Sequence, residues 1–275
     1  MRIHISHETT YCYETPATST IQILRLTPRN HDGQYIVRWR TEVNQDCKLD
    51  QFDDAFSNIA HTFTVNGPVR QLSIRVEGEV ETQDTAGIIK GTIECFPPSL
   101  YLRETPLTKP DTAIIEFAES ASKTEKGEPL KVMHELVSRI YNDFIFDPDP
   151  NTPPMTAAEC MARKRGVCQD YAQILIASAR YLGIPARYVS GYFLRADGKV
   201  DQEAGHAWTE VHLPKLGWVA FDPANGISAT DAHVRVAVAL DSLGAAPVRG
   251  LHFGGTGEKL SVAVHVDQAQ RQAQN

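Results

Sequence analysis

Hydrophobic and polar residues alternate along much of the first hundred positions. The alternation is regular at residues 2–6, 35–40 and 72–77, and turn-forming Asp, Asn, Gly and Pro residues stand between these stretches. A period of two sends successive side chains to opposite faces of a strand, so each stretch predicts a strand with one wet and one buried face. Several such strands separated by turns are typical of an antiparallel β-sandwich, which we expect over residues 1–100.

The pattern changes to a helical period after a proline-rich segment at residues 97–110. Apolar residues then recur at intervals of three and four, which predicts helices at 111–122 and 129–141. Because proline interrupts both helices and strands, the proline-rich segment is a natural boundary. We therefore expect two domains, a β-rich one at 1–100 and a second one at 101–275.

A further helix is predicted at residues 168–182, and a cysteine lies in its first turn. Apolar positions spaced by three and four give this helix one inward face, which includes Cys168, and Gly183 followed by Pro185 marks its end. At a helix start, unpaired backbone N–H groups and the positive end of the dipole favour a thiolate and can hold an oxyanion. The position of Cys168 therefore suits a nucleophile.

A hairpin follows, with a strand at 206–213, a turn at 214–217 and a second strand at 218–221. In an antiparallel hairpin the end of the second strand lies beside the start of the first. Asp222 should therefore lie next to His206, where its carboxylate can accept from one imidazole nitrogen and fix the tautomer.

Each of these three residues also has an ordinary explanation. A lone cysteine is often a buried structural thiol, and a lone histidine is often a surface or core residue. Asp before Pro is a common way to begin a turn. The joint pattern favours the chemical interpretation: Cys168 as nucleophile, His206 as base and Asp222 as the group that orients the base.

Three segments resemble the bacterial transglutaminase-like family. Gly-Val-Cys-Gln-Asp-Tyr-Ala at 166–172 continues into Leu-Gly-Ile-Pro-Ala-Arg-Tyr-Val-Ser-Gly-Tyr at 182–192. His-Ala-Trp-Thr-Glu-Val at 206–211 and Gly-Trp-Val-Ala-Phe-Asp-Pro at 217–223 complete the resemblance. It implies an α+β fold with a papain-like core. It also implies the same three roles for the cysteine, histidine and aspartate.

The N-terminal part resembles the β-rich domain that precedes this core in one branch of the family. The landmarks are residues 24–29, Gln34 and residues 53–58. Two positions depart from the usual pattern: Gly205 stands where serine is usual, and Ala224 stands where threonine is usual. Neither departure removes a member of the expected triad.

Composition narrows the function classes. The net charge is −7, the isoelectric point is near 5.8 and no dense Lys/Arg run occurs, so we expect no nucleic-acid partner. No apolar stretch approaches about 20 residues, and the first residues lack the apolar region of a signal peptide, so we expect no membrane partner and a cytoplasmic location.

Five cysteines are scattered along the chain without CxxC spacing: Cys12, Cys47, Cys95, Cys160 and Cys168. This arrangement fits a reducing compartment and supports neither a metal site nor a cofactor. Cys160, eight residues before Cys168, is either a redox partner or, as burial statistics favour, a packing residue.

The expected chemistry is attack of the thiolate on an amide carbonyl and formation of a thioester. One oxyanion donor is the backbone N–H of Cys168, and candidates for the second are Tyr141, Asn142 and Gln169. Trp208 is either a wall of the cleft that shields the histidine–aspartate pair or a core residue.

Three functions stay open. The first, which we favour because no acceptor-amine site is visible, is a cysteine hydrolase of peptide or isopeptide bonds. The second is a transamidase that joins glutamine to lysine, and the third is a non-catalytic module that retains the fold. The expected partner is a peptide or protein substrate, and its specificity should depend on loops at 195–199 and 224–260. The sequence does not define the oligomeric state.

Overall fold

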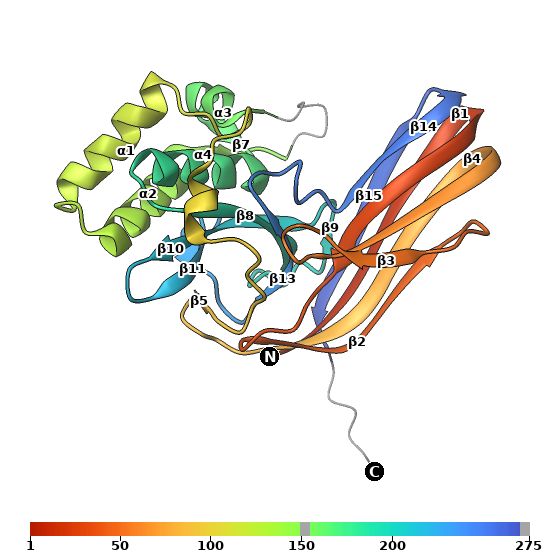
Figure 1. Ribbon diagram of the computed structural model, residues 1–275, viewed down its shortest axis with the longest axis horizontal. Helices are drawn as coiled ribbons and strands as arrows, with labels where there is room; N and C mark the ends of the chain where they lie inside the picture. The colour runs from red at the N-terminus through yellow and green to blue at the C-terminus, as the bar shows by residue number, and fades with distance from the viewer. Residues whose placement is uncertain (149–154, 270–275) are drawn as a thin grey trace, which may run out of the picture.

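Antiparallel sheets and a group of helices make up the structure, a computed structural model that describes residues 1–148 and 155–269 (Figure 1). The expected α+β class is confirmed. The parts of the predicted second domain at 149–154 and 270–275 lie outside the described residues. Figure 1 shows the first sheet on one side, with the second sheet and the helices beside it.

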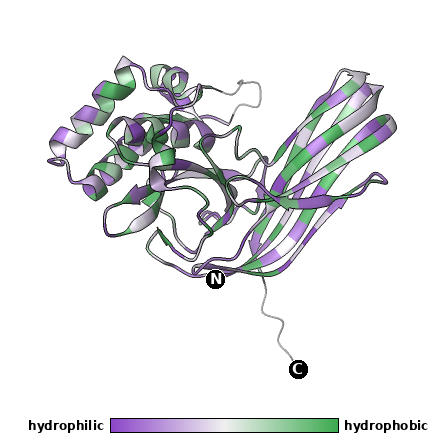
Figure 2. Ribbon diagram, in the orientation of Figure 1, coloured by the Kyte–Doolittle hydropathy of each residue, from purple (hydrophilic) through white to green (hydrophobic). Residues whose placement is uncertain are grey.

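The first sheet has seven strands and is built around two long ones. The order is β2 (Gln34–Val43), β4 (Ile59–Thr82), β1 (Arg2–Thr27), β15 (Lys259–Gln268) and β9 (Asp201–Gln202). Two further strands pair outside this order: β14 (Val248–Thr256) pairs with β1, and β3 (Asp50–Asp53) pairs with β4. Hydrophobic and hydrophilic positions alternate along these strands, as Figure 2 shows. This alternation is the pattern that predicted strands from the sequence.

The first sheet is antiparallel, as expected for residues 1–100, and it also extends into the C-terminal part of the chain. β1 is 26 residues long, so it pairs with β15 along its first half and with β14 along its second half. The N-terminal strands therefore belong to one hydrogen-bonded sheet, which also takes in the C-terminal strands. Alternation shows which residues form a strand, but not which strand will lie beside it. The domain boundary near residue 100 stays a prediction.

The second sheet holds the predicted hairpin. Its order is β12 (Ile227–Ser228), β11 (Gly217–Asp222), β10 (His206–Leu213), β8 (Ala186–Phe193) and β13 (His233–Ala239), and β5 (Ile88–Ile89) also pairs with β11. The helical segments are η1 (Pro98–Leu102), α1 (Thr112–Thr124), α2 (Pro129–Asp143), α3 (Ala157–Arg163) and α4 (Cys168–Tyr181). A short parallel pair joins β6 (Ile145–Phe146) to β7 (Arg165–Gly166).

Helix α4 is enclosed on all sides. Every residue from 170 to 180 is buried, whereas the sequence predicted a single inward face. The reason is that α4 lies between the second sheet and the other helices, so it has no solvent face (Figure 1). Its one buried arginine, Arg180, donates to the carbonyl oxygens of Tyr101, Ala186 and Leu240, and burial lowers its pKa to about 10.

The two sheets are joined through β13, the end strand of the second sheet. The side-chain amide of Gln34 donates to the carbonyl oxygen of Arg235 at 2.9 Å, and the backbone N–H of Arg235 donates back to Gln34 Oε1 at 2.8 Å. Asn58 makes the same kind of pair with Val238. Two amide side chains thus satisfy backbone groups at this strand edge, where a further strand would otherwise be needed.

The aspartate at position 54 fixes Asn58 for this contact. Asp54 Oδ1 accepts from the backbone N–H of Asn58 at 3.0 Å, and Oδ2 accepts from the Asn58 amide at 3.0 Å and from Arg25 at 2.8 Å. These residues fall within the N-terminal landmarks of the sequence. Their shared role in the structure is to hold the two sheets together.

Candidate active site

Cys168 is the first residue of α4 and is partly buried. The backbone N–H of Val167 donates to the carboxylate of Asp170 at 3.0 Å, which closes the chain into the helix start. A Cβ at Gly166 would lie 2.7 Å from Asp170 Oδ2 and 3.0 Å from Cys160 Sγ, so only glycine fits without a shift. The Gly-Val-Cys sequence therefore builds the turn that presents the thiol at the helix N-terminus.

His206 is the first residue of β10, and Asp222 is the last residue of β11. The hairpin register brings the fully buried carboxylate to the imidazole, with Asp222 Oδ2 2.6 Å from His206 Nε2. The strand is fixed against α4 because the hydroxyl of Thr209 donates to the carbonyl oxygen of Ala172 at 3.1 Å. The structure thus brings together the three residues that the sequence singled out.

The thiol of Cys168, at the start of α4, is near enough to the His206 imidazole to raise the pKa of that ring. Because Nε2 faces Asp222, the nitrogen left for the thiol is Nδ1. Burial lowers the pKa of His206, but the negative charges of Asp222 and Cys168 outweigh burial and raise it to about 10. An imidazole in this position can accept the thiol proton and hold it as an imidazolium.

The Asp222 carboxylate is saturated with donors. Burial acts to raise its pKa, but the neighbouring histidines hold that pKa well below the usual range. Its five donors are His206 Nε2, His233 Nε2 and Asn225 Nδ2 on Oδ2, and the backbone N–H groups of Ala224 and Asn225 on Oδ1. The departure at position 224 does not affect this contact, since a backbone N–H makes it.

Of these donors, the sequence predicted only His206. Asn225 follows Asp222 by three residues, and the turn in which Asp222 accepts from the next backbone N–H groups is an Asx turn that the Asp-Pro sequence suggests. His233 gave no such signal because it arrives from a different strand, β13.

Aromatic rings enclose the imidazole. The Trp208 ring centroid lies 6.0 Å from that of His206, and the Phe193 centroid lies at 5.2 Å. Trp208 is 1% exposed and packs over Gly191, where a Cβ would lie 2.6 Å from the indole ring. Trp208 was predicted to be either a wall of the cleft or a core residue. The structure supports the core residue, and its ring also lies beside the His206 imidazole.

The oxyanion candidates differ in their surroundings. As the first helical residue, Cys168 has a backbone N–H without an intrahelical acceptor. The amide of Asn142 donates to Ser138 at 3.2 Å, and the Tyr141 ring packs against Gly226. Gln169 lies beside the thiol in the first turn of α4. Which of the three side chains is the second donor stays a prediction.

The spacing of His206, Asp222 and His233 also suits a metal ion, since one ligand atom from each lies within 4.8 Å of the others. However, the backbone N–H of Thr230 donates to His233 Nδ1 at 3.1 Å. His233 therefore carries its hydrogen on Nε2, which donates to Asp222, and this nitrogen has no lone pair for a metal. The donor set fits a hydrogen-bond network better than a metal centre.

Cys160 is fully buried, and burial together with Asp170 raises its pKa to about 12. Its thiol donates to the carbonyl oxygen of Arg165 at 3.5 Å. A thiol held protonated in this way is a packing residue, and all five cysteines are free thiols in the structure.

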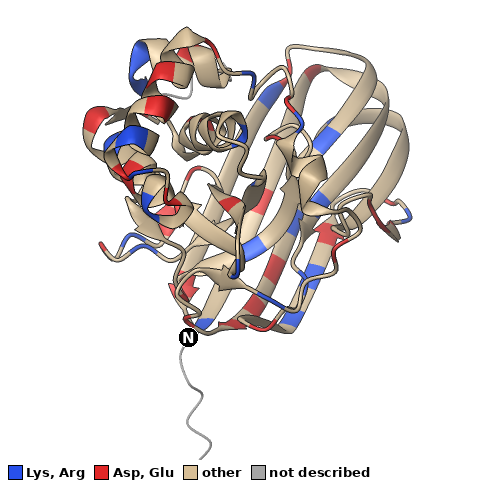
Figure 3. Cartoon of the chain, turned by 60° about the vertical axis from the view of Figure 1, so that its left-hand side comes forward, with Lys and Arg blue, Asp and Glu red and all other residues tan. Residues whose placement is uncertain are grey.

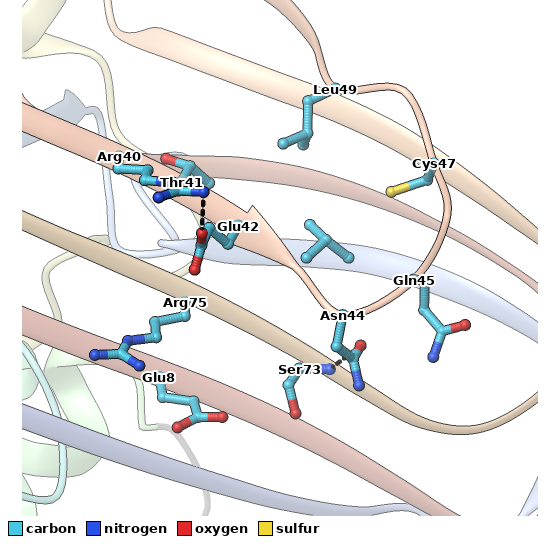
Figure 4. Close-up of a pocket in the computed structure, with 11 residues that line it drawn as sticks. Glu8, Arg40, Thr41, Glu42, Asn44, Gln45, Cys47, Leu49, Ser73 and Arg75 are labelled. Atoms are coloured by element: carbon cyan, nitrogen blue, oxygen red, sulfur yellow. Dashed lines mark hydrogen bonds and ion pairs between the residues drawn. The ribbon is translucent and has the colours of Figure 1, made fainter.

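A surface hollow of about 480 Å³ lies on the first sheet, away from these residues (Figure 4). Its wall comes from β1, β2, β4 and the loop after β2. Arg40 pairs with Glu42 at 2.6 Å, and Asn44 accepts from the backbone N–H of Ser73 at 2.8 Å. The wall holds one thiol, Cys47, whose pKa is raised by burial and by Asp46, so we do not assign catalysis to the hollow.

Charges of both signs are interleaved along the strands of the first sheet, as Figure 3 shows. Glu79, for example, lies between Arg2 and Arg38 and pairs with both at 2.6 Å. This mixture gives ion-pair ladders and no single-sign patch along these strands. In the part of the chain that the structure describes, no helix is long and apolar enough to cross a bilayer.

Two regions of the sequence match known families. Residues 3–81 match the bacterial transglutaminase-like N-terminal region, and residues 116–223 match the transglutaminase-like superfamily. The chain belongs to the bacterial transglutaminase-like family. The resemblance inferred from the sequence motifs is thereby confirmed.

Relatives span the whole chain but leave its activity open. An uncharacterized protein of Mycobacterium leprae is 27% identical over 96% of this chain and 98% of its own length. A protein-glutamine gamma-glutamyltransferase of Pseudomonas aeruginosa is 32% identical, over 44% of this chain and 20% of its own. The crystal structure of a candidate cysteine protease from Cytophaga hutchinsonii has a TM-score of 0.65 at 20% identity, covering 96% of this chain and 90% of that one, and so shares the fold.

Proposed function

We propose that this protein is a cysteine acyl-transfer enzyme in which Cys168 is the nucleophile, His206 the base and acid, and Asp222 the orienting group. The observation that carries the proposal is the contact between His206 Nε2 and the buried Asp222 Oδ2 at 2.6 Å, beside a thiol at the start of α4 that raises the pKa of His206. This is the arrangement that activates a thiol for attack on a carbonyl.

In the first half-reaction, His206 takes the thiol proton and the thiolate attacks the carbonyl carbon of a peptide, isopeptide or glutamine amide. The C–S bond forms while the carbonyl oxygen becomes an oxyanion, which the backbone N–H of Cys168 can stabilise. The imidazolium then gives its proton to the leaving amine as the C–N bond breaks. A thioester on Cys168 and a free amine result.

In the second half-reaction, water gives a proton to His206 and attacks the thioester. The C–S bond breaks, the acid product leaves and the thiolate–imidazolium pair returns. Asp222 stays ionised throughout, because its donors hold its pKa well below the usual range. Its role is to keep the imidazole in one orientation and to stabilise the imidazolium.

We favour hydrolysis over transamidation, because no channel for an acceptor amine is apparent among the described residues. The Pseudomonas relative named as a gamma-glutamyltransferase is the observation that keeps transamidation as the second candidate. A non-catalytic module that retains the fold is the third. A peptide or protein substrate and a cytoplasmic location stay predictions.

The test compares the wild-type protein with Cys168→Ala on a glutamine-rich protein substrate, with and without a fluorescent primary amine. Peptide mass spectrometry reports cleavage, deamidation and amine incorporation in one sample. The matched control is Cys12→Ala, which removes an exposed thiol far from α4 in the sequence.

Hydrolysis predicts cleavage or deamidation that Cys168→Ala abolishes and Cys12→Ala leaves intact. Faster incorporation of the amine than of water would favour the transamidase. Product formation unchanged by Cys168→Ala would remove the nucleophile assignment.

A further inference from the structure

A second histidine contacts the aspartate of the site from the opposite side. His233 is the first residue of β13 and is buried, and its Nε2 lies 3.1 Å from Asp222 Oδ2. Its ring is held between Phe193 at 4.7 Å and Trp208 at 5.2 Å, measured between ring centroids. The imidazole therefore has little freedom to turn away from the carboxylate.

The direction of this hydrogen bond is fixed by the backbone. Because the N–H of Thr230 donates to His233 Nδ1, Nδ1 must offer a lone pair and Nε2 must carry the hydrogen. His233 is thus a neutral donor to Asp222. His206, in contrast, gains and loses a proton in the proposed reaction.

We propose that His233 is a positioning residue, which keeps Asp222 ionised and directed at His206 while touching neither the thiol nor the substrate. A fully buried carboxylate is costly unless its oxygens are hydrogen-bonded. Without the donor from His233, Asp222 Oδ2 would keep His206 and Asn225 only. The inference rests on the proposed function, because it assigns a role within the same triad.

Other charged groups near His233 are already neutralised or paired. Glu210 accepts from Arg235 at 2.7 Å, and burial together with Arg235 lowers the pKa of His31 to about 4, so His31 is neutral near pH 7. A change of reactivity on substitution of His233 would therefore report on Asp222 and His206.

Two substitutions distinguish the effect of the His233 N–H donor from the effect of its aromatic ring. His233→Phe keeps an aromatic ring between Phe193 and Trp208 but has no N–H for Asp222. His233→Gln loses the ring but places an amide N–H where Nε2 stood. The readout is the rate of alkylation of Cys168 by iodoacetamide from about pH 5 to about pH 9, read by mass spectrometry, because this rate needs no knowledge of the substrate.

The expected result is that His233→Phe slows alkylation of Cys168 roughly tenfold at about pH 6 and moves the acid limb of the profile to higher pH. Tenfold is the lower end for loss of a hydrogen bond to a charged group. His233→Gln should recover most of the rate. A folded His233→Phe variant with the wild-type profile would overturn the positioning role.

His206→Ala distinguishes this inference from the proposed function. If His206→Ala leaves the Cys168 rate unchanged, the triad itself is wrong. If His206→Ala slows labelling and His233→Phe does not, only the inference on His233 fails. The exposed Cys12 thiol of the same chain serves as the internal reference.

A measurement on the wild-type protein keeps the test valid if His233→Phe does not fold. Nitrogen NMR of the histidine side chains reports which ring nitrogen carries the hydrogen. The account requires hydrogen on Nε2 of His233 across neutral pH. Hydrogen on Nδ1 would overturn it.

Discussion

Asn58 and Val238 lie 180 residues apart in the sequence and are joined by two hydrogen bonds. The Asn58 amide donates to the Val238 carbonyl oxygen at 2.8 Å, and the Val238 N–H donates to Asn58 Oδ1 at 2.8 Å. Both residues are buried. Val238 belongs to β13, whose first residue contacts Asp222, so the N-terminal sheet supports the strand that backs the proposed active site.

Asn58→Ala should therefore destabilise the whole protein. The substitution leaves the N–H and C=O of Val238 without these partners, and each buried unsatisfied group costs about 1–3 kcal/mol. We expect a loss of about 2–4 kcal/mol in the free energy of unfolding, measured by urea denaturation. Asn66→Ala, at an exposed amide that contacts Ser19, is the control and should change little. Equal effects of the two variants would contradict the role of Asn58.

Substitution of Glu210 should also destabilise the whole protein, for an electrostatic reason. Its carboxylate is fully buried and accepts from Arg187 and Arg235 at 2.7 Å each, and although burial raises its pKa, the two arginines lower it to about 2. Glu210→Ala leaves the buried Arg187 guanidinium and the partly buried Arg235 guanidinium without this partner, which costs about 3–5 kcal/mol. Thermal unfolding measures the loss. Glu42→Ala, which breaks the exposed pair with Arg40, should leave the midpoint nearly unchanged.

Two glycines near the site differ in the space around them. A Cβ at Gly191 would lie 2.1 Å from the Val234 carbonyl oxygen, so Gly191→Ala must shift β13 or Trp208. Overpacking of this kind costs about 1–3 kcal/mol, and it should also slow alkylation of Cys168. At Gly205 a Cβ would meet only the Gly191 carbonyl oxygen, at 3.0 Å. Gly205→Ser should therefore destabilise the protein less than Gly191→Ala. A larger loss of stability in Gly205→Ser would contradict the packing described.

Stability should fall on both sides of neutral pH for two identifiable reasons. The pKa of His206 is raised from about 6.5 in the unfolded chain to about 10, so its contribution is present below about pH 6.5 and is lost as pH rises towards 10. The pKa of Asp222 is depressed, so its contribution is present above about pH 4 and is lost as pH falls.

Urea denaturation of the wild type and of His206→Ala at a series of pH values measures the predicted loss of stability at alkaline pH. The wild type should lose roughly a few kcal/mol between about pH 6.5 and pH 10, since one unit of pKa shift corresponds to about 1.4 kcal/mol. The variant should lose less over the same range. Parallel profiles would show that His206 is not the group that titrates.

Much of the site was predictable because its signals are local. Cys168 stands at a helix start that glycine and the apolar period define, and the hairpin alone brings Asp222 to His206. β10 begins and ends at the residues predicted, 206 and 213. These features depend on neighbours in the sequence, and so periodicity and turn chemistry are sufficient to find them.

The remaining features depend on contacts between distant segments. Nothing near His233 indicates that it faces Asp222, because that contact follows from where β13 joins the second sheet. The strand β15, near the end of the chain, pairs with β1 at its beginning. Pairing of this kind is decided by the packing of the whole fold and leaves no local trace in the sequence.

Activation of the Cys168 thiol is measured by the rate at which iodoacetamide alkylates Cys168 in the native protein, compared with Cys12 in the same sample. Cys168 is partly buried and Cys12 is exposed, so access alone favours Cys12. If His206 activates the thiol, Cys168 should react faster than Cys12 near pH 7, and His206→Ala should abolish this difference. Labelling of Cys168 no faster than Cys12, in a protein shown to be folded, would contradict an activated thiol.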